Sequence, residues 1–245
     1  MRYLILSDMH GNWDAFEAVL KKAQPETYDG VLVLGDLVGY GASPNEIVEA
    51  VRDLPHPIIV RGNHDKVVAG IDRGENFNHV ALAAARWSTS ALSAENLSYV
   101  RELPVGPTSI HPALAICHGS PLDEDAYVFS DYDAYEIFAA HSTELTFFGH
   151  THVPSLFTVG RRGIEVKALK GEGSLTLDSK ARYLINPGSI GQPRDRDPRA
   201  SYMTYDEEAR LITWHRLDYP IATAQRRIVE AGLPSVLADR LAVGI

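Results

Sequence analysis

The chain contains a single cysteine, Cys117, among its 245 residues. One cysteine excludes an internal disulfide framework and is typical of proteins in a reducing compartment. The sequence also lacks any apolar run near the roughly 20 residues that a membrane-spanning helix requires. Its first apolar run is too short for the core of a signal peptide. We therefore expect a cytoplasmic protein with no membrane association.

Clustered positive charge is absent as well. The chain has 23 Lys and Arg against 32 Asp and Glu, which gives a net charge of −9. Nucleic-acid backbones and anionic membranes bind proteins mainly through clusters of basic residues. The composition therefore disfavours both partners and leaves small molecules as the expected ligands. The hydrophobic content of 45% is sufficient for one sizeable core.

Five short apolar runs predict buried β-strands. Three of them are each followed by a polar turn and a helical pattern, which predicts parallel strands joined by crossover helices. Two more follow in the middle of the chain. The five runs are Arg2–Leu6, Val31–Leu34, Pro57–Val60, Leu114–Cys117 and Leu145–Phe148.

The remaining segments predict other kinds of secondary structure. Residues 66–103 have a helical composition and are expected to form a helical insertion or lid. After Pro154, short runs separated by turn residues predict a second, mainly antiparallel sheet over 155–217. Residues 220–245 are expected to form C-terminal helices. We find no repeat or flexible linker, so 1–245 is predicted to be a single α/β domain.

Polar residues gather where the predicted strands end. In open α/β sheets, ligands bind at the carboxyl ends of the strands. Carboxylate, imidazole and amide oxygen without thiolate suit Mn²⁺, Fe, Zn²⁺, Ni²⁺ or Co²⁺. Each residue alone has an equally good structural interpretation, such as a helix cap or a hydrogen-bonded turn. Together they exceed the needs of one metal and fit two ions about 3.5 to 4 Å apart, with Asp36 as the candidate bridge. The set is Asp8, His10, Asp36, Asn63, His64, His118, His150 and His152.

The order of these residues resembles the calcineurin-like metallophosphoesterase superfamily. Five blocks carry the resemblance over residues 1 to about 190. They are Asp8-x-His10, Gly35-Asp36, Gly62-Asn63-His64-Asp65, His118 and Gly149-His150-Thr151-His152. The phrases Ser7-Asp8-Met9-His10-Gly11-Asn12 and Asn186-Pro187-Gly188-Ser189 are more similar to the small bacterial and archaeal phosphodiesterase branch than to the large eukaryotic enzymes.

The resemblance implies a four-layer α/β/β/α sandwich of two mixed β-sheets flanked by helices. It also implies two ligand sets and a proton donor to the leaving oxygen, His64, oriented by Asp65. One ion would be bound by Asp8, His10, Asp36 and His152. The other would be bound by Asp36, Asn63, His118 and His150.

The implied function is metal-dependent hydrolysis of a small phosphoester by a metal-bound hydroxide. We expect two divalent transition-metal ions, Mn²⁺ first, and favour phosphodiesters over phosphomonoesters. The alternative is a catalytically silent scaffold or binding protein that keeps the fold. Eight converging polar groups favour the enzyme, because each is costly to bury without a partner.

One departure from the family pattern concerns the substrate. The residues after Asp36 lack the Asp-Arg-Gly continuation of the protein phosphatase and diadenosine tetraphosphatase branches, which argues against phosphoprotein substrates. Three arginines in the later segment 192–199, namely Arg194, Arg196 and Arg199, are candidates for binding substrate charge. A salt-linked surface turn is the preferred interpretation of this segment, so these arginines are not counted among the predicted site residues.

Overall fold

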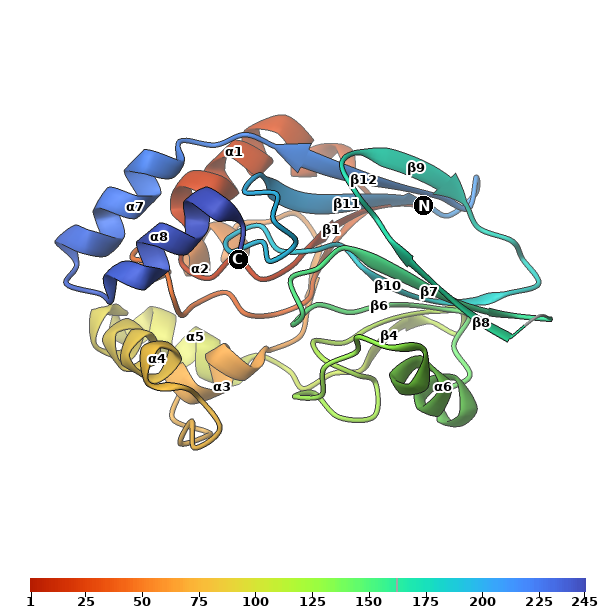
Figure 1. Cartoon of the computed structure of the whole chain (residues 1–245), viewed down its shortest axis with the longest axis horizontal. Helices are drawn as coiled ribbons and strands as arrows, with labels where there is room; N and C mark the ends of the chain where they lie inside the picture. The colour runs from red at the N-terminus through yellow and green to blue at the C-terminus, as the bar shows by residue number, and fades with distance from the viewer. Residues whose placement is uncertain (162) are drawn as a thin grey trace.

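Two six-stranded sheets pack face to face, with helices on their outer sides (Figure 1). The structure is a computed structural model that describes every residue except Arg162. In the first sheet, β1 lies between β2 and β11, and the neighbours β1, β2 and β3 are parallel. The strands of this sheet, in spatial order, are β3 (Pro57–Ile59), β2 (Gly30–Val33), β1 (Arg2–Leu6), β11 (Ala200–Asp206), β12 (Leu211–Leu217) and β9 (Gly173–Thr176).

The second sheet is also mixed. Strands β5, β6 and β10 are parallel neighbours, and the two edges are antiparallel. Its edge strand β4 was not predicted from the sequence. In spatial order the strands are β4 (Thr108–His111), β5 (Leu114–Ile116), β6 (Leu145–Phe147), β10 (Arg182–Asn186), β7 (Ser155–Gly160) and β8 (Gly163–Ala168).

Alternate residues of β1 face two different cores, because successive side chains of a strand point to opposite faces. Tyr3 and Ile5 join the core between the two sheets, where β5 and β6 contribute as well. Leu4 and Leu6 join the core under the outer helices. Both faces of the strand are therefore buried, which explains why its sequence is apolar without alternation. The predicted four-layer α/β/β/α sandwich is confirmed.

Helices cover the two outer faces unequally. Asn12 caps α1 by accepting a hydrogen bond from the backbone of Ala15, as its position before the helix predicts. On the second sheet, α6 (Asp131–Ala140) is the one helix among the described residues that packs against the outer face. The helices on the side of the first sheet are α1 (Trp13–Ala23), α2 (Pro44–Arg52), α4 (His79–Ala91), α5 (Ala94–Glu102), α7 (Ile221–Glu230) and α8 (Ser235–Val243).

The prediction of a separate second sheet over 155–217 requires correction. Strands β7, β8 and β10 extend the sheet that contains β5 and β6, whereas β9, β11 and β12 extend the sheet that contains β1. Hydrophobic alternation shows that a strand has a buried face but does not identify its hydrogen-bonding neighbour. That neighbour is set by long-range pairing, here between β1 and β11 about 200 residues apart.

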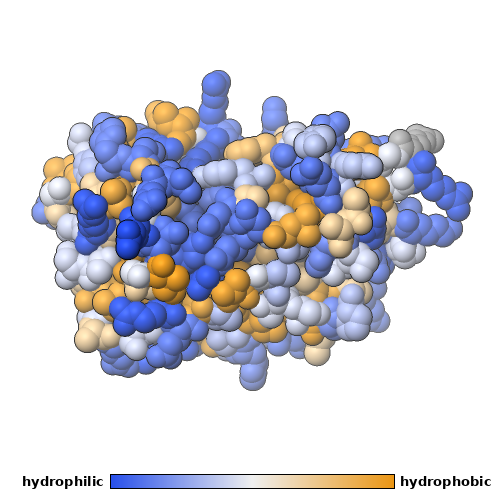
Figure 2. Space-filling view, turned by 90° about the horizontal axis from the view of Figure 1, so that it is seen from below, coloured by the Kyte–Doolittle hydropathy of each residue, from blue (hydrophilic) through white to orange (hydrophobic). Residues whose placement is uncertain are grey.

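The helical prediction for 66–103 agrees with α4 and α5, which follow the short helix α3 (Asn63–Val68). Their buried residues, including Ala84 and Val100, belong to the same core as α1 and α2. A lid motion of this segment stays a prediction. Seen from below, the molecule mixes hydrophilic and hydrophobic residues (Figure 2). Among the described residues, no helix is both long and apolar enough to span a bilayer.

Candidate functional site

The candidate site lies where β1, β2 and β3 end, in loops with unusual backbone angles. Three of the polar residues in these loops, Asp8, His10 and Asp36, have φ values of 55°, 48° and 52°. His150 and His152, after β6, have φ values of 67° and 60°. A left-handed backbone is unfavourable for residues other than glycine and clusters at functional sites. Five predicted ligands therefore share a conformation that only their surroundings can maintain.

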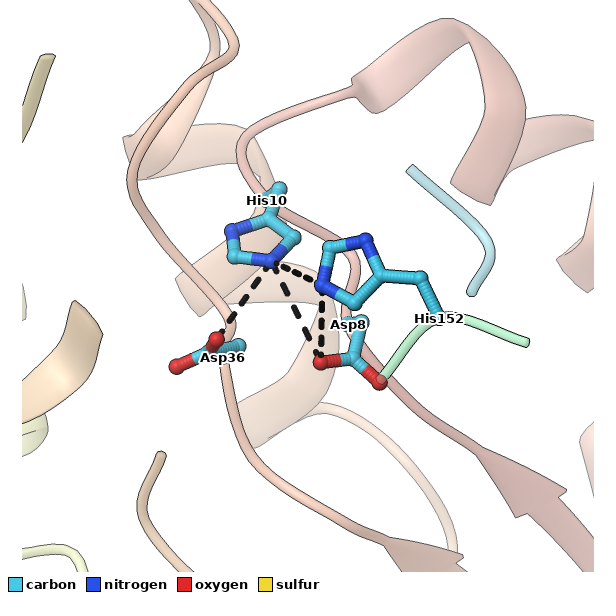
Figure 3. Close-up of side chains that lie close together, drawn as sticks. All are labelled: Asp8, His10, Asp36 and His152. Atoms are coloured by element: carbon cyan, nitrogen blue, oxygen red, sulfur yellow. Dashed lines mark hydrogen bonds and ion pairs between the residues drawn. The ribbon is translucent and has the colours of Figure 1, made fainter. Parts of the chain in front are cut away.

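Two clusters of buried side chains form from these loops. The first contains Asp8, His10, Asp36 and His152, which point toward one another (Figure 3). The Nε2 atom of His10 lies 3.4 Å from Oδ2 of Asp36, and Nε2 of His152 lies 3.3 Å from Oδ1 of Asp8. All four side chains are at most 2% exposed. These are the four residues that the resemblance assigns to one metal ion.

The second cluster shares Asp36 with the first and adds His118 and His150. The Nε2 atom of His118 lies 3.4 Å from Oδ2 of Asp36 and 3.2 Å from Nδ1 of His150. The amide oxygen of Asn63 is 3.1 Å from the same Nε2 atom. The structure therefore brings all seven predicted metal ligands together, with Asp36 between the clusters.

Backbone carbonyls fix the orientation of four histidine rings. Nδ1 of His10 donates to the carbonyl of Val38 at 3.0 Å, and Nδ1 of His152 donates to that of Gln192 at 2.6 Å. The corresponding bonds of the second cluster run from His118 to Leu34 and from His150 to Asp125. Because a carbonyl only accepts, the second nitrogen of each ring directs its lone pair toward the cluster centre when that ring is neutral, which is the form in which histidine binds a metal. Such outer bonds are typical of metal-binding histidines.

The contact between His10 and His152 tests whether a metal fits. Their Nε2 atoms are 3.0 Å apart. Burial lowers the pKa of both imidazoles, so both are neutral near pH 7 and two lone pairs face each other. This contact is repulsive unless a cation lies within reach of both nitrogens. The donor set of carboxylates and imidazoles is one that divalent transition metals prefer, so the residues present fit such an ion.

The acidic members are ionised. Burial opposes ionisation of Asp8, but the neighbouring His152 holds the pKa of Asp8 at about 2. Burial would also lower the pKa of His118, yet the Asp36 carboxylate raises it to about 10. Protonated His118 therefore supplies positive charge beside Asp36 in the metal-free protein. A metal ion at this position would displace that proton.

Comparison with known proteins gives the family. A model of the calcineurin-like phosphoesterase superfamily domain matches residues 1–210. The chain belongs to this superfamily. The prediction from the five motif blocks is confirmed, and the members of the superfamily are phosphoester hydrolases.

Two solved structures and one sequence relative show the extent of the likeness. An uncharacterized protein, MJ0912 of Methanocaldococcus jannaschii, is 37% identical over 244 residues, which cover 98% of this chain and 97% of the relative. A metallophosphoesterase from Sphaerobacter thermophilus is 42% identical, with a TM-score of 0.87 over 100% of this chain and 99% of that one. Hypothetical protein PH1004 from Pyrococcus horikoshii OT3, 20% identical, shares the fold with a TM-score of 0.81 over 100% and 98% of the two chains.

Asp65 does not have its predicted role of orienting His64. Its carboxylate accepts hydrogen bonds from the backbone of Asp36 at 2.8 Å, Leu37 at 3.0 Å, Val38 at 3.3 Å and Gly62 at 2.9 Å. The predicted partner, Nδ1 of His64, is buried and has no hydrogen-bond partner among the described residues. Asp65 therefore holds the Asp36 loop in place instead of orienting His64. The sequence placed the two residues side by side, but α3 begins at Asn63 and turns their side chains apart.

His64 lies beside the first ligand cluster, and aromatic rings surround it. Its ring centroid is 4.4 Å from that of Tyr40, 4.5 Å from that of Phe77 and 4.8 Å from that of His10. Burial lowers its pKa to about 4. Gly39, with φ 86°, permits this packing, because a Cβ there would lie 2.4 Å from Nδ1 of His64. Tyr40 was not among the residues predicted from the sequence, although its position between two glycines, in a loop after a ligand-bearing strand, could have indicated it.

Metal removal is expected to lower the stability of the folded protein. Without a cation, the buried carboxylates of Asp8 and Asp36 repel each other, and the lone pairs of His10 and His152 remain opposed. An ion present at 100 times its dissociation constant stabilises a fold by about 2.7 kcal/mol. We expect a melting temperature several degrees lower after chelation and recovery on adding Mn²⁺, measured by calorimetry. An unchanged melting temperature across chelation and Mn²⁺ addition would contradict metal binding here.

Proposed function

We propose that this protein is a dinuclear metal-dependent phosphoesterase of the cytoplasm that acts on small phosphodiesters, and less well on phosphomonoesters. The observation that carries the proposal is the pair of ligand clusters that share Asp36. A cleft of about 140 Å³ beside Asn63 and His150 offers room for a second ester substituent, which supports diesters. Mn²⁺ is the first candidate metal, with Fe, Zn²⁺, Ni²⁺ and Co²⁺ as alternatives. The single cysteine, Cys117, is buried and unpaired, which supports a reducing compartment.

The ligand clusters would hold one ion with Asp8, His10, Asp36 and His152 and the other with Asp36, Asn63, His118 and His150. Divalent ions bound there would lower the pKa of water and neutralise charge on the phosphoryl oxygens. In the overall reaction, the water oxygen bonds to phosphorus, the bond from phosphorus to the ester oxygen breaks, and the alcohol leaves with a proton.

His64 is the residue that we assign to this proton transfer. Its ring lies against His10 and is 4% exposed, so it is shielded from bulk water. Its backbone N–H donates to Oδ1 of Asp36 at 2.9 Å, which ties its position to the shared ligand. The negative charge of a bound phosphoester raises the pKa of a neighbouring imidazole. His64 would therefore gain its proton together with the substrate and give it to the leaving oxygen.

Arg194 is the cation that we assign to the substrate phosphate. Its guanidinium lies 5.7 Å from the ring centroid of Tyr40 and donates to the Tyr40 hydroxyl at 3.3 Å. Its Nε is buried and has no hydrogen-bond partner among the described residues, while its Nη2 also donates to Oε1 of Gln192 at 3.1 Å. Arg199 instead pairs with Asp197, as the surface-turn interpretation predicts. Arg196 contributes a backbone hydrogen bond to Gly244.

Replacing Arg194 by alanine is expected to raise KM for phosphoesters about tenfold, because a hydrogen bond to a charged group contributes about 1.5 to 3 kcal/mol. The matched control is Arg199→Ala, since that guanidinium is already neutralised by Asp197. Steady-state kinetics on each ester gives KM for Arg194→Ala and for the control Arg199→Ala. If KM is the same for Arg194→Ala and wild type on every ester, the assignment is wrong.

The proposed function is tested by removing metal, restoring Mn²⁺ and measuring turnover of p-nitrophenyl phosphate and bis-p-nitrophenyl phosphate. Elemental analysis of the purified protein accompanies the assay. We expect about two ions per chain and faster turnover of the diester. The scaffold alternative predicts neither bound metal nor turnover with Mn²⁺, Zn²⁺, Ni²⁺ or Co²⁺.

A further inference from the structure

The second sheet ends in an edge strand that is open to solvent. Among the described strands, β8 pairs with β7 alone, and five of its six residues are exposed. Edge strands are usually protected by proline, a bulge or an overlying segment, because their free backbone groups can pair with another strand. The strand β8 contains no proline, and its pairing with β7 is regular along its whole length. This edge is therefore available to a further strand.

Exposed aromatic side chains of α6 lie next to this edge. Helix α6 packs against β8, where Phe138 and Ile164 belong to one small core. Tyr132 and Tyr135 of α6 are nonetheless 66% and 62% exposed, and Val166 of β8 is 47% exposed. The two tyrosines and Ile164 line one groove between the helix and the strand. Both elements lie at the end of the molecule opposite α7 and α8 (Figure 1). Large exposed side chains gathered on one face are typical of an interaction surface.

The charges of β8 match those of a second copy of the same strand. Glu165 and Lys167 flank Val166 and point to the opposite face of the sheet, because successive side chains alternate. A two-fold axis through Val166 places Glu165 of each antiparallel strand opposite Lys167 of the partner subunit. An axis through Glu165 or Lys167 would instead place like charges opposite each other. Facing charges of opposite sign stabilise an antiparallel pair and like charges destabilise it, so the sequence selects the first register.

We propose that β8 and α6 form the interface of a homodimer, in which the two β8 strands pair antiparallel about this axis. Such an interface presents the same patch on both subunits and closes on itself. Ile164 lies opposite Ala168 of the partner subunit, on the face that carries α6. Because α6 packs on β8, the two α6 helices flank the axis, and Tyr132 and Tyr135 become covered. This helix contribution is needed, since a stable interface buries about 800 Å² on each partner and one short strand does not supply that area.

The proposed interface is separate from the candidate active site. None of the seven predicted metal ligands lies in α6 or β8. The assembly can therefore be tested whether or not the protein hydrolyses phosphoesters. For variants of β8, an unchanged melting temperature shows that each chain is folded.

The test is sedimentation velocity of the full chain over a series of protein concentrations. We expect wild type to form a dimer. Glu165→Lys and Lys167→Glu each place two pairs of like charges across the axis, so each is expected to raise the dissociation constant about tenfold or more. The chain that carries both changes has opposite charges facing again and should dimerise as wild type does. An equimolar mixture of the two single variants should form a heterodimer for the same reason.

Glu230→Lys is the matched control, because Glu230 is an exposed residue of α7, on the helices that cover the first sheet. It makes the same charge change and should leave the dimer intact. A wild-type protein that stays monomeric at every concentration overturns the inference. It is also overturned if the single variants dimerise as wild type does, or if the double variant and the mixture stay monomeric.

Discussion

Replacing Asp36 by asparagine is expected to lower phosphoester hydrolysis by at least about 1,000-fold, because a bridging carboxylate supports both ions and each ion stabilises several kcal/mol of charge. The metal-free fold should survive. Asparagine keeps an acceptor for the backbone N–H of His64, which now bonds Oδ1 at 2.9 Å. Its amide group can donate to the Nε2 atoms of His10 and His118, each 3.4 Å from Oδ2 of Asp36.

Two measurements separate loss of metal from loss of fold. Elemental analysis of Asp36→Asn should find fewer ions per chain than in wild type, and calorimetry should find a melting temperature near that of chelated wild type. Asp239→Asn, an exposed change on α8, is the matched control for the loss of one negative charge. If Asp36→Asn retains both its ions and its activity, Asp36 does not bridge a metal centre.

Replacing His64 by alanine is expected to lower kcat on an alkyl phosphodiester about 100-fold to 10,000-fold, the range that general acid catalysis contributes. The loss should be far smaller on bis-p-nitrophenyl phosphate, because nitrophenolate leaves without being protonated. The measurement is the fold-loss of kcat on the alkyl phosphodiester divided by the fold-loss of kcat on bis-p-nitrophenyl phosphate. Substrate binding is compared through KM, since His64 is packed against Tyr40 and Phe77 and its removal leaves a cavity.

The dependence of the loss on the leaving group distinguishes a missing proton donor from a general disturbance of the site. A variant that only disturbed the fold or the metal ions would slow both esters equally, and that outcome would remove His64 from the proposed mechanism. His79→Ala supplies the matched control, because His79 is an exposed helix-start residue of α4 that lies outside the site. The effect of Asp65→Asn is expected on stability rather than on the leaving-group dependence, since its carboxylate binds backbone N–H groups and not His64.

The amino-acid sequence by itself determined the strands and the ligand types. The run Arg2–Leu6 matches the bounds of β1, and the other four predicted runs match their strands to within one residue at each end. A strand buried on both faces leaves such an uninterrupted apolar run. The polar residues that follow, from Asp8 to His152, were identified because each follows directly from the end of a strand. The spacing of residues within a local motif can be read from the sequence without knowing which other segments lie beside it in space.

Only the tertiary structure decided which strands share a sheet and what each polar group contacts. The pairing of β1 with β11 and the division of the later strands between two sheets depend on long-range burial. The same holds for Asp65, whose hydrogen bonds go to the Asp36 loop, and for Tyr127, which reaches His150 from a loop that no motif marks. These contacts join segments far apart in the chain, and their geometry is set by packing of the whole core. Local sequence patterns therefore do not predict these contacts.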